Sequence, residues 1–156
     1  MKNNHHLHQL KEVAFAHCSK FVAERLERLN RQAKEISAAL TSETKSSAGD
    51  KHETGRAMLQ LEREKLGVQL AEAEKMQALL HKVPQKITFT SVGLGALVVT
   101  SVSTYFIAVS AGEITHKKDR AYCISPATPI GKLLMGKQAG DRFSFQSKDA
   151  TILAVI

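Results

Sequence analysis

The sequence predicts an α+β protein that consists of a long helical hairpin followed by a small domain rich in β-strands. Three observations lead to this prediction. In the first half of the chain, apolar residues recur at alternating steps of four and three, which is the spacing of a coiled-coil helix. Pro84 interrupts that pattern, and the second half alternates short apolar runs with turn-forming residues. We therefore expect a hairpin over residues 1–84 and a second domain over residues 85–156.

Length and composition are compatible with this division. A chain of 156 residues accommodates one ordinary domain, or a small domain with an extended element attached. Its apolar and charged fractions of 43% and 24% are those of a folded soluble protein. Only 5% of the residues are aromatic and none is Trp, so we expect a modest core.

The helical prediction depends on two apolar seams. The first seam consists of Val22, Leu26, Leu29, Ala33, Ile36 and Leu40. The second consists of Leu59, Leu66, Leu70, Ala73 and Leu80. Seams of this kind need a partner, and two in one chain predict an antiparallel coiled coil.

The stretch SSAGDKHETG, residues 46–55, separates the two seams and is expected to form a loop. Helices of about 30 residues rise about 45 Å, so the hairpin is expected to extend well beyond a small domain, with its tip at about residues 41–55. Pro84 is expected to end the second helix, because proline lacks the backbone donor and restricts the residue before it.

The second half reads as strands separated by turns. The expected strands are KITFTSV, ALVVTS, TYFIAVS, AYCIS, DRFSFQS and ATILAVI. Between them, TPIGKLLMGKQAGD places Ile130, Leu133 and Leu134 at one-turn spacing, which indicates a short helix before a glycine-bounded turn.

One segment also fits a membrane helix, because Ile87–Gly112 contains no charged residue and is long enough to span a bilayer. Its serines, threonines, glycines and β-branched residues favour strands instead. The start of the chain lacks the apolar stretch of a signal peptide. Cys18 and Cys123 show no C-x-x-C spacing, so they indicate neither a zinc site nor a disulfide framework. We expect a cytoplasmic protein.

The formal net charge of +7 is spread over both halves of the chain and favours an acidic partner, such as nucleic acid or an enzyme that acts on it. A pI near 9.5 is also common among ordinary soluble proteins. The basic residues Arg25, Arg28, Arg31 and Lys34 have two interpretations: phosphate contacts to RNA, or ordinary charge pairs on a helix surface.

Two motifs resemble those of the Gre transcript cleavage factors, which insert a coiled coil into the secondary channel of bacterial RNA polymerase. The run ISPATPIGKLLMGKQAGDRFSF is similar to the family's C-terminal pattern: a strand end, a Ser/Thr-Pro-Ile step, a Leu-rich helix and Gly-Lys-x-x-Gly-Asp. Gly49-Asp50-x-x-Glu53 is similar to the family's tip motif. The resemblance covers most of residues 10–156 and implies a Gre-like, that is FKBP-like, C-terminal domain.

The resemblance implies a transcription elongation factor that binds RNA polymerase and stimulates cleavage of backtracked nascent RNA. Asp50 and Glu53 would act at the polymerase active site by binding Mg²⁺ that is shared with the polymerase. Thr128, Pro129 and Ile130 would dock on the polymerase. The chain would then be a stimulator of the polymerase's own cleavage activity and not an enzyme, with no cofactor of its own.

Other interpretations stay open. Asp50 and Glu53 also have the spacing of a capping box, in which Asp50 caps the helix and Glu53 reaches back to it. Where the family usually continues its tip with Asn and a nearby Tyr, this chain has Thr54, Gly55 and Arg56. A regulator that occupies the channel without stimulating cleavage is therefore the main alternative, and a coiled-coil adaptor is another.

Two independent enzymes are weaker alternatives. An acyl transferase that uses Cys123 lacks a recognisable Cys-His-Asn spacing. A prolyl isomerase would need a pocket lined by aromatic side chains. The residues available for such a lining are Phe89, Tyr105, Phe106, Tyr122, Phe143 and Phe145.

Overall fold

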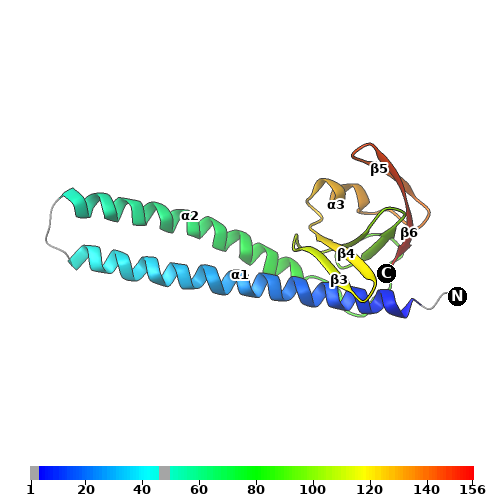
Figure 1. Ribbon diagram of the computed structural model, residues 1–156, viewed down its shortest axis with the longest axis horizontal. Coiled ribbons are helices and arrows are strands. Elements are labelled where there is room, and N and C mark those ends of the chain that lie inside the picture. Colours follow the sequence, from blue (N-terminus) through cyan, green and yellow to red (C-terminus); the bar gives the residue numbers. More distant parts are fainter. Residues whose placement is uncertain (1–3, 46–49) are drawn as a thin grey trace. The chain divides into compact units, whose positions relative to one another are not determined.

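The computed structural model describes residues 4–45 and 50–156, and of residues 44–45 and 50–52 the backbone alone. Two long helices precede a six-stranded mixed sheet and a short helix, so the expected α+β class is confirmed (Figure 1). The elements are α1 (His5–Lys45), α2 (Asp50–His81), β1 (Leu97–Thr100), β2 (Thr104–Ile107), β3 (Gly112–His116), β4 (Asp119–Ile124), α3 (Pro129–Leu134), β5 (Arg142–Phe145) and β6 (Lys148–Val155).

By internal packing the chain divides into two units. The hairpin unit is Val22–Gln77, which comprises most of α1 and α2. The sheet unit contains the described residues up to Phe21 together with Ala78–Ile156. Each long helix therefore contributes residues to both units. The expected boundary at residue 84 stays a prediction about domain organisation.

In the hairpin unit, α1 and α2 pack as an antiparallel pair (Figure 1). Arg25 near the start of this part of α1 contacts Met76 of α2, whereas Glu43 near its end lies against Gly55. The buried side chains between the helices are Leu29, Leu66 and Ala73, with half-buried Leu26, Ala33, Ile36 and Leu70 packed around them. The coiled-coil seam read from the sequence is confirmed.

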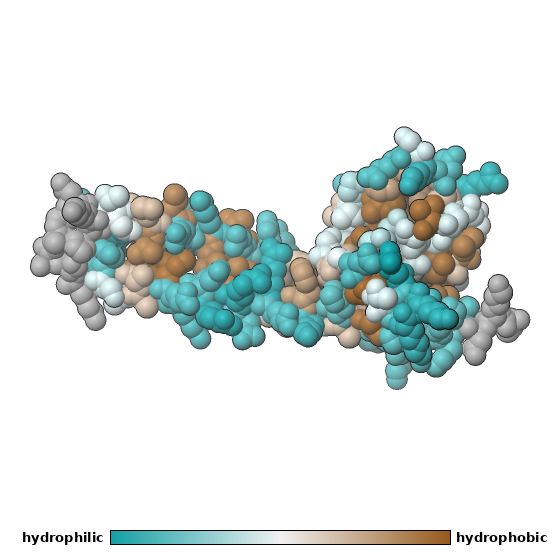
Figure 2. Space-filling view, viewed as in Figure 1, coloured by the Kyte–Doolittle hydropathy of each residue, from teal (hydrophilic) through white to brown (hydrophobic). Residues whose placement is uncertain are grey.

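The hairpin unit leaves apolar side chains of α2 in contact with solvent. Met58, Leu61 and Val68 are 63%, 56% and 61% exposed. Figure 2 shows hydrophobic residues at the surface of the hairpin among hydrophilic ones. A two-helix pair has only one seam in which to bury apolar groups, so side chains outside the seam stay accessible.

The interhelical segment is shorter than the sequence suggests. α1 continues to Lys45 and α2 begins at Asp50, so the stretch Asp50–Gly55, which was expected to be part of a loop, is helical. Asp is a preferred residue at a helix start. Gly55 within the helix costs only about 1 kcal/mol relative to Ala, which neighbouring turns offset.

The sheet unit contains strands in the order β3-β4-β2-β1-β6-β5. All neighbours are antiparallel except β2 and β4, which are parallel and place Tyr105 beside Tyr122 and Phe106 beside Cys123. The pairing of β1 with β6 shifts register between Val99 and Thr100. In this sheet β3 and β5 are the two edge strands.

The sheet packs against α3, and the beginning of α1 also belongs to this unit. On one face, α3 contributes Ile130 and Leu134 to a core with Val98, Ile107 and Ile152. The beginning of α1 packs elsewhere on this unit: His17 Nε2 donates a 2.9 Å hydrogen bond to the carbonyl of Ala111. Leu10, Ala14 and Cys18 of α1 are buried.

Two strand predictions were wrong. KITFTSV, residues 86–92, forms no strand: Lys86 has a φ of 55°, Ile87 is 47% exposed, and the Val92 N–H and C=O bond to Lys137 and Gly136 of the segment after α3. The backbone groups of Val92 therefore have partners outside the sheet. β3 was not expected, because it begins at a glycine and carries charged and polar residues, yet it pairs along its whole length with β4. The other five expected strands and the short helix are present.

Among the described residues, no helix combines the length and the apolar character that crossing a membrane requires.

Candidate functional site

The first candidate site is the start of α2, at the end of the hairpin unit where the chain reverses. Asp50 is the first residue of α2, and Glu53 lies in the same turn with an exposed side chain. Toward the described residues, Glu53 forms no hydrogen bond or ion pair. A carboxylate in the first helical turn is favoured by the exposed N–H groups and the helix dipole.

Glu43 of α1 is a third acidic residue of this region. Its carboxylate atoms lie 3.7–3.9 Å from the point where a Cβ would stand on Gly55. The side chain is half-buried and engaged by its surroundings. Glu43 therefore packs against α2 at Gly55.

The choice between a capping box and metal binding stays a prediction, because the side chain of Asp50 lies outside the described residues, as does Gly49. In the described part of the chain, no group of three or more His, Cys, Asp or Glu side chains is placed to hold a metal ion. The exposed Glu53 carboxylate is a hard oxygen donor. Mg²⁺ takes few protein carboxylates and keeps several waters, so this donor type fits a cation held mainly by another molecule.

The second candidate site is the start of α3, in the sheet unit. Thr128 caps this helix: its Oγ1 accepts a 3.1 Å hydrogen bond from the Gly131 N–H and donates a 2.7 Å bond to the Ser125 carbonyl. Pro129 occupies the first helical turn, where a missing N–H costs nothing. Ile130 is 8% exposed and belongs to the core under α3.

The turn before α3 is closed tightly by Gly131. A Cβ at Gly131 would stand 2.2 Å from the Ser125 carbonyl oxygen and 2.8 Å from Thr128 Oγ1. Any larger residue would therefore disrupt the cap. Of the three predicted docking residues, only Pro129 is exposed, while Thr128 and Ile130 hold the local structure together. Their role in partner binding stays a prediction.

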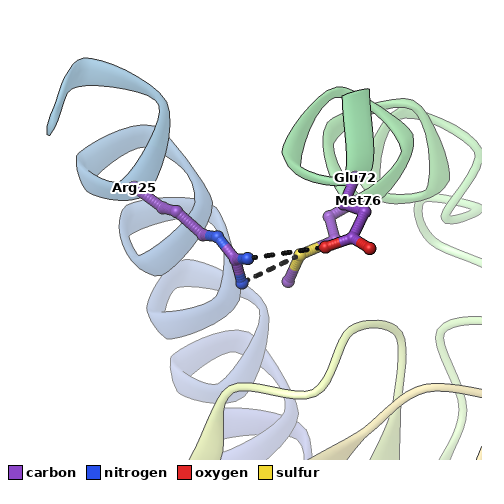
Figure 3. A network of polar contacts seen from close by, with 3 residues as sticks. All are labelled: Arg25, Glu72 and Met76. Atoms are coloured by element: carbon purple, nitrogen blue, oxygen red, sulfur yellow. Dashed lines mark hydrogen bonds and ion pairs between the residues drawn. The ribbon is translucent and has the colours of Figure 1, made fainter. Parts of the chain in front are cut away.

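Two of the four basic residues singled out on α1 have carboxylates nearby. Arg25 Nη2 lies 4.0 Å from Glu72 Oε2, and its Nη1 lies 3.9 Å from the sulfur of Met76 (Figure 3). Arg31 approaches Glu27 of its own helix at 3.4 Å. These contacts favour the interpretation as helix-surface charge pairs over the one as RNA contacts.

A third site was not singled out from the sequence as a site. Four of the six aromatic residues considered for an isomerase pocket, Tyr105, Tyr122, Phe143 and Phe145, line one cavity of about 430 Å³ in the sheet unit. The individual aromatic residues were visible in the sequence. Their convergence was not, because it depends on the parallel pairing of β2 with β4 and on the edge position of β5.

The comparisons with known proteins are sparse. No family model matches the sequence, and no curated protein matches it. Among solved structures, the chain is similar to the one titled as that of the transcription factor Gfh1, with 19% identity over 86% of this chain and 90% of that chain and a TM-score of 0.34. At this TM-score the likeness carries no argument about fold or function.

Proposed function

We propose that the chain is a Gre-like transcription elongation factor that binds RNA polymerase through its secondary channel and stimulates cleavage of backtracked nascent RNA. The observation that carries the proposal is the position of the acidic motif. Asp50 and Glu53 stand in the first turn of α2, where an antiparallel pair of long helices reverses direction. A helix cap alone does not require a hairpin of this length.

The C-terminal run supports the same proposal. After β4 ends at Ile124, the run continues as a Thr-capped helix, and Gly136 and Gly140 then take φ values of 81° and 94° before β5 begins. Each glycine of the motif thus stands where a positive φ or a missing Cβ is needed. A structural role for these residues is compatible with docking through exposed Pro129.

In this proposal the chain is not itself an enzyme. Mg²⁺ held jointly with the polymerase would supply a bound, oriented water for hydrolysis of the RNA phosphodiester. The task of this chain's residues is to present carboxylates: Glu53 is exposed and without a described partner, and helix α2 holds Asp50 in the same turn.

The test is a cleavage assay with backtracked elongation complexes of the cognate RNA polymerase in Mg²⁺. The Asp50→Asn/Glu53→Gln double variant should lose at least about tenfold in the rate of RNA 3′-end cleavage while it still binds. The matched control is Glu72→Gln/Glu74→Gln, which removes two exposed carboxylates from the same helix and should cleave like the wild type.

The residues around the acidic motif also favour a second candidate function, that of a regulator that does not stimulate cleavage. Lys51 and Arg56 stand beside the acidic residues, where the family's usual residues are absent. If the wild type and the double variant both bind and neither stimulates cleavage, the chain is a non-cleaving regulator of the channel. If neither binds polymerase, both functions are wrong. Pro129→Glu, at an exposed position, should weaken binding without changing the fold.

A further inference from the structure

The cavity lined by Tyr105, Tyr122, Phe143 and Phe145, here called the aromatic pocket, is built on three strands. Tyr105 of β2 and Tyr122 of β4 are register partners, and their ring centroids lie 6.2 Å apart at an interplanar angle of 36°. Phe143 and Phe145 are two residues apart on β5, so they share a face of the sheet. Figure 2 shows hydrophobic residues at the surface near α3 and β5, surrounded by hydrophilic ones.

The residues that line the aromatic pocket differ in their exposure to solvent. Ala150 is buried, whereas Val102 at the mouth is 55% exposed. A volume of about 430 Å³ is in the range of small-ligand and side-chain pockets. The core cluster already covers the remaining part of this sheet face with α3, so the hollow is the stretch that α3 leaves uncovered.

Several polar groups of the pocket have no partner within the described residues. The hydroxyl groups of Tyr105, Tyr122 and Ser103 form no hydrogen bonds there, and the Lys148 ammonium forms no ion pair. Lys148 is the one charged residue among the lining residues, and none of them is acidic. The pocket therefore favours a ligand that combines an apolar ring with a negative charge.

The strand that carries the two phenylalanines is also an open edge. β5 is last in the strand order, pairs only with β6, and forms no other described backbone hydrogen bonds. Such an edge presents free N–H and C=O groups to an additional strand. A peptide added there would alternate its side chains, so every second one would stand on the face of Phe143 and Phe145.

We propose that the aromatic pocket and the β5 edge together bind an extended acidic segment of a partner protein, with an aromatic side chain of that segment in the pocket. The segment pairs with the outer edge of β5, its ring packs among the four aromatic rings, and a neighbouring carboxylate faces Lys148. This inference does not depend on the proposed action at the polymerase active site.

The probe is the peptide Thr-Asp-Val-Phe-Val-Glu-Thr-amide, with fluorescein attached to its N-terminal amine, added to the full chain. We expect saturable binding by fluorescence anisotropy and amide NMR shifts concentrated on β5, β6 and the pocket. Replacing the peptide Phe by Ser should weaken binding at least about tenfold, because the ring is the buried anchor. Replacing its acidic residues by Lys should also weaken binding.

Two protein variants test the pocket without disturbing its core. Lys148→Glu should weaken binding of the acidic peptide at least about threefold and should improve binding of the peptide whose acidic residues are replaced by Lys. Its matched control is Lys118→Glu, an exposed lysine in the β3–β4 turn, which should change nothing. Val102→Glu, at an exposed position of the pocket mouth, should also weaken binding of the acidic peptide.

Four outcomes would overturn the proposal. The first is no saturable binding at millimolar peptide, and the second is equal binding of the Phe and Ser peptides. The third is equal effects of Lys148→Glu and Lys118→Glu on binding. The fourth is that free N-acetylphenylalanine binds as tightly as the peptide, which would mean a small-molecule pocket with no contribution from the β5 edge.

Discussion

The hairpin unit and the sheet unit of this chain bury their apolar residues in different ways. In the hairpin unit a single seam holds Leu29, Leu66 and Ala73, and α2 leaves Met58, Leu61 and Val68 in solvent. In the sheet unit one core cluster alone contains nine buried residues. They come from β1, β2, β5 and β6, from the loop before β1, and from α3. A two-helix pair therefore builds a thin core along one seam, whereas a sheet covered by a helix builds a thicker core.

Replacing a buried leucine by alanine should cost more stability in the thick core of the sheet unit than in the thin core of the hairpin unit. Leu134→Ala in the sheet unit, where the side chain is fully buried, should lower the free energy of unfolding by about 4 kcal/mol. Leu66→Ala in the hairpin unit should cost about 2–3 kcal/mol, because a two-helix seam collapses more easily around the lost atoms. Urea denaturation followed with hydrogen exchange locates each effect. Equal losses spread over both units would contradict the comparison.

Two glycine substitutions should have opposite signs. Gly131→Ala places a methyl group against the Ser125 carbonyl, so it should destabilise the sheet unit by about 1–3 kcal/mol. Gly67→Ala adds a methyl group to α2 where nothing lies within 4 Å, so it should stabilise the hairpin unit by about 0.5–1 kcal/mol. Thermal unfolding monitored by circular dichroism measures both. A stabilising Gly131→Ala would mean that the turn before α3 is looser than described.

Alkaline pH should weaken the sheet unit through its buried thiol pair. The hydrogen bond with Cys18 and burial raise the pKa of the Cys123 thiol above its ordinary 9.0, while that same hydrogen bond lowers the pKa of Cys18. Above about pH 9 the unfolded chain loses the Cys123 proton and the folded chain keeps it, so stability falls by up to about 1.4 kcal/mol per pH unit.

The control for this pH effect is Cys123→Ala, which removes the raised pKa. Urea unfolding of the wild type and this variant between pH 7 and pH 10.5 should show a steeper decline for the wild type above pH 9. Parallel curves would mean that other groups, such as lysines, cause the alkaline loss.

The smallest expected effect concerns the charge pair of the hairpin unit. Glu72→Gln removes the partner 4.0 Å from Arg25, but Glu72 is 62% exposed, so water already screens the pair (Figure 3). The free energy of unfolding should change by less than about 0.5 kcal/mol, with little dependence on salt. A loss above 1 kcal/mol in the free energy of unfolding would mean that this contact contributes substantially to the stability of the hairpin unit.

The structure of the hairpin unit could be predicted from the sequence more completely than that of the sheet unit. The seam positions and the helix end before Pro84 follow from local spacing, which a single chain segment determines. The absence of a strand at residues 86–92 and the parallel pairing of β2 with β4 depend on partners far away in sequence, which local alternation does not reveal.

The candidate sites show the same limit. The motif at Asp50 and Glu53 identified the start of α2, although residues 50–55 were assigned to a loop. The motif did not reveal that the Thr128 hydroxyl closes a cap, because the sequence does not show the turn geometry that places this hydroxyl on the Ser125 carbonyl. It did not reveal how deeply Ile130 is buried either, because most of the core residues around Ile130 come from distant strands. The aromatic pocket likewise required the sheet order.

The crowding at Gly131 also gives a way to recognise relatives of this chain. With a carbonyl oxygen 2.2 Å from any added Cβ, this position excludes every residue type but glycine as long as the turn before α3 keeps its shape. Thr128 could drift to Ser and Pro129 to other helix-starting residues. In divergent homologues, this glycine should therefore stay fixed after the acidic tip motif has changed, which makes it an anchor for aligning proteins whose activities differ.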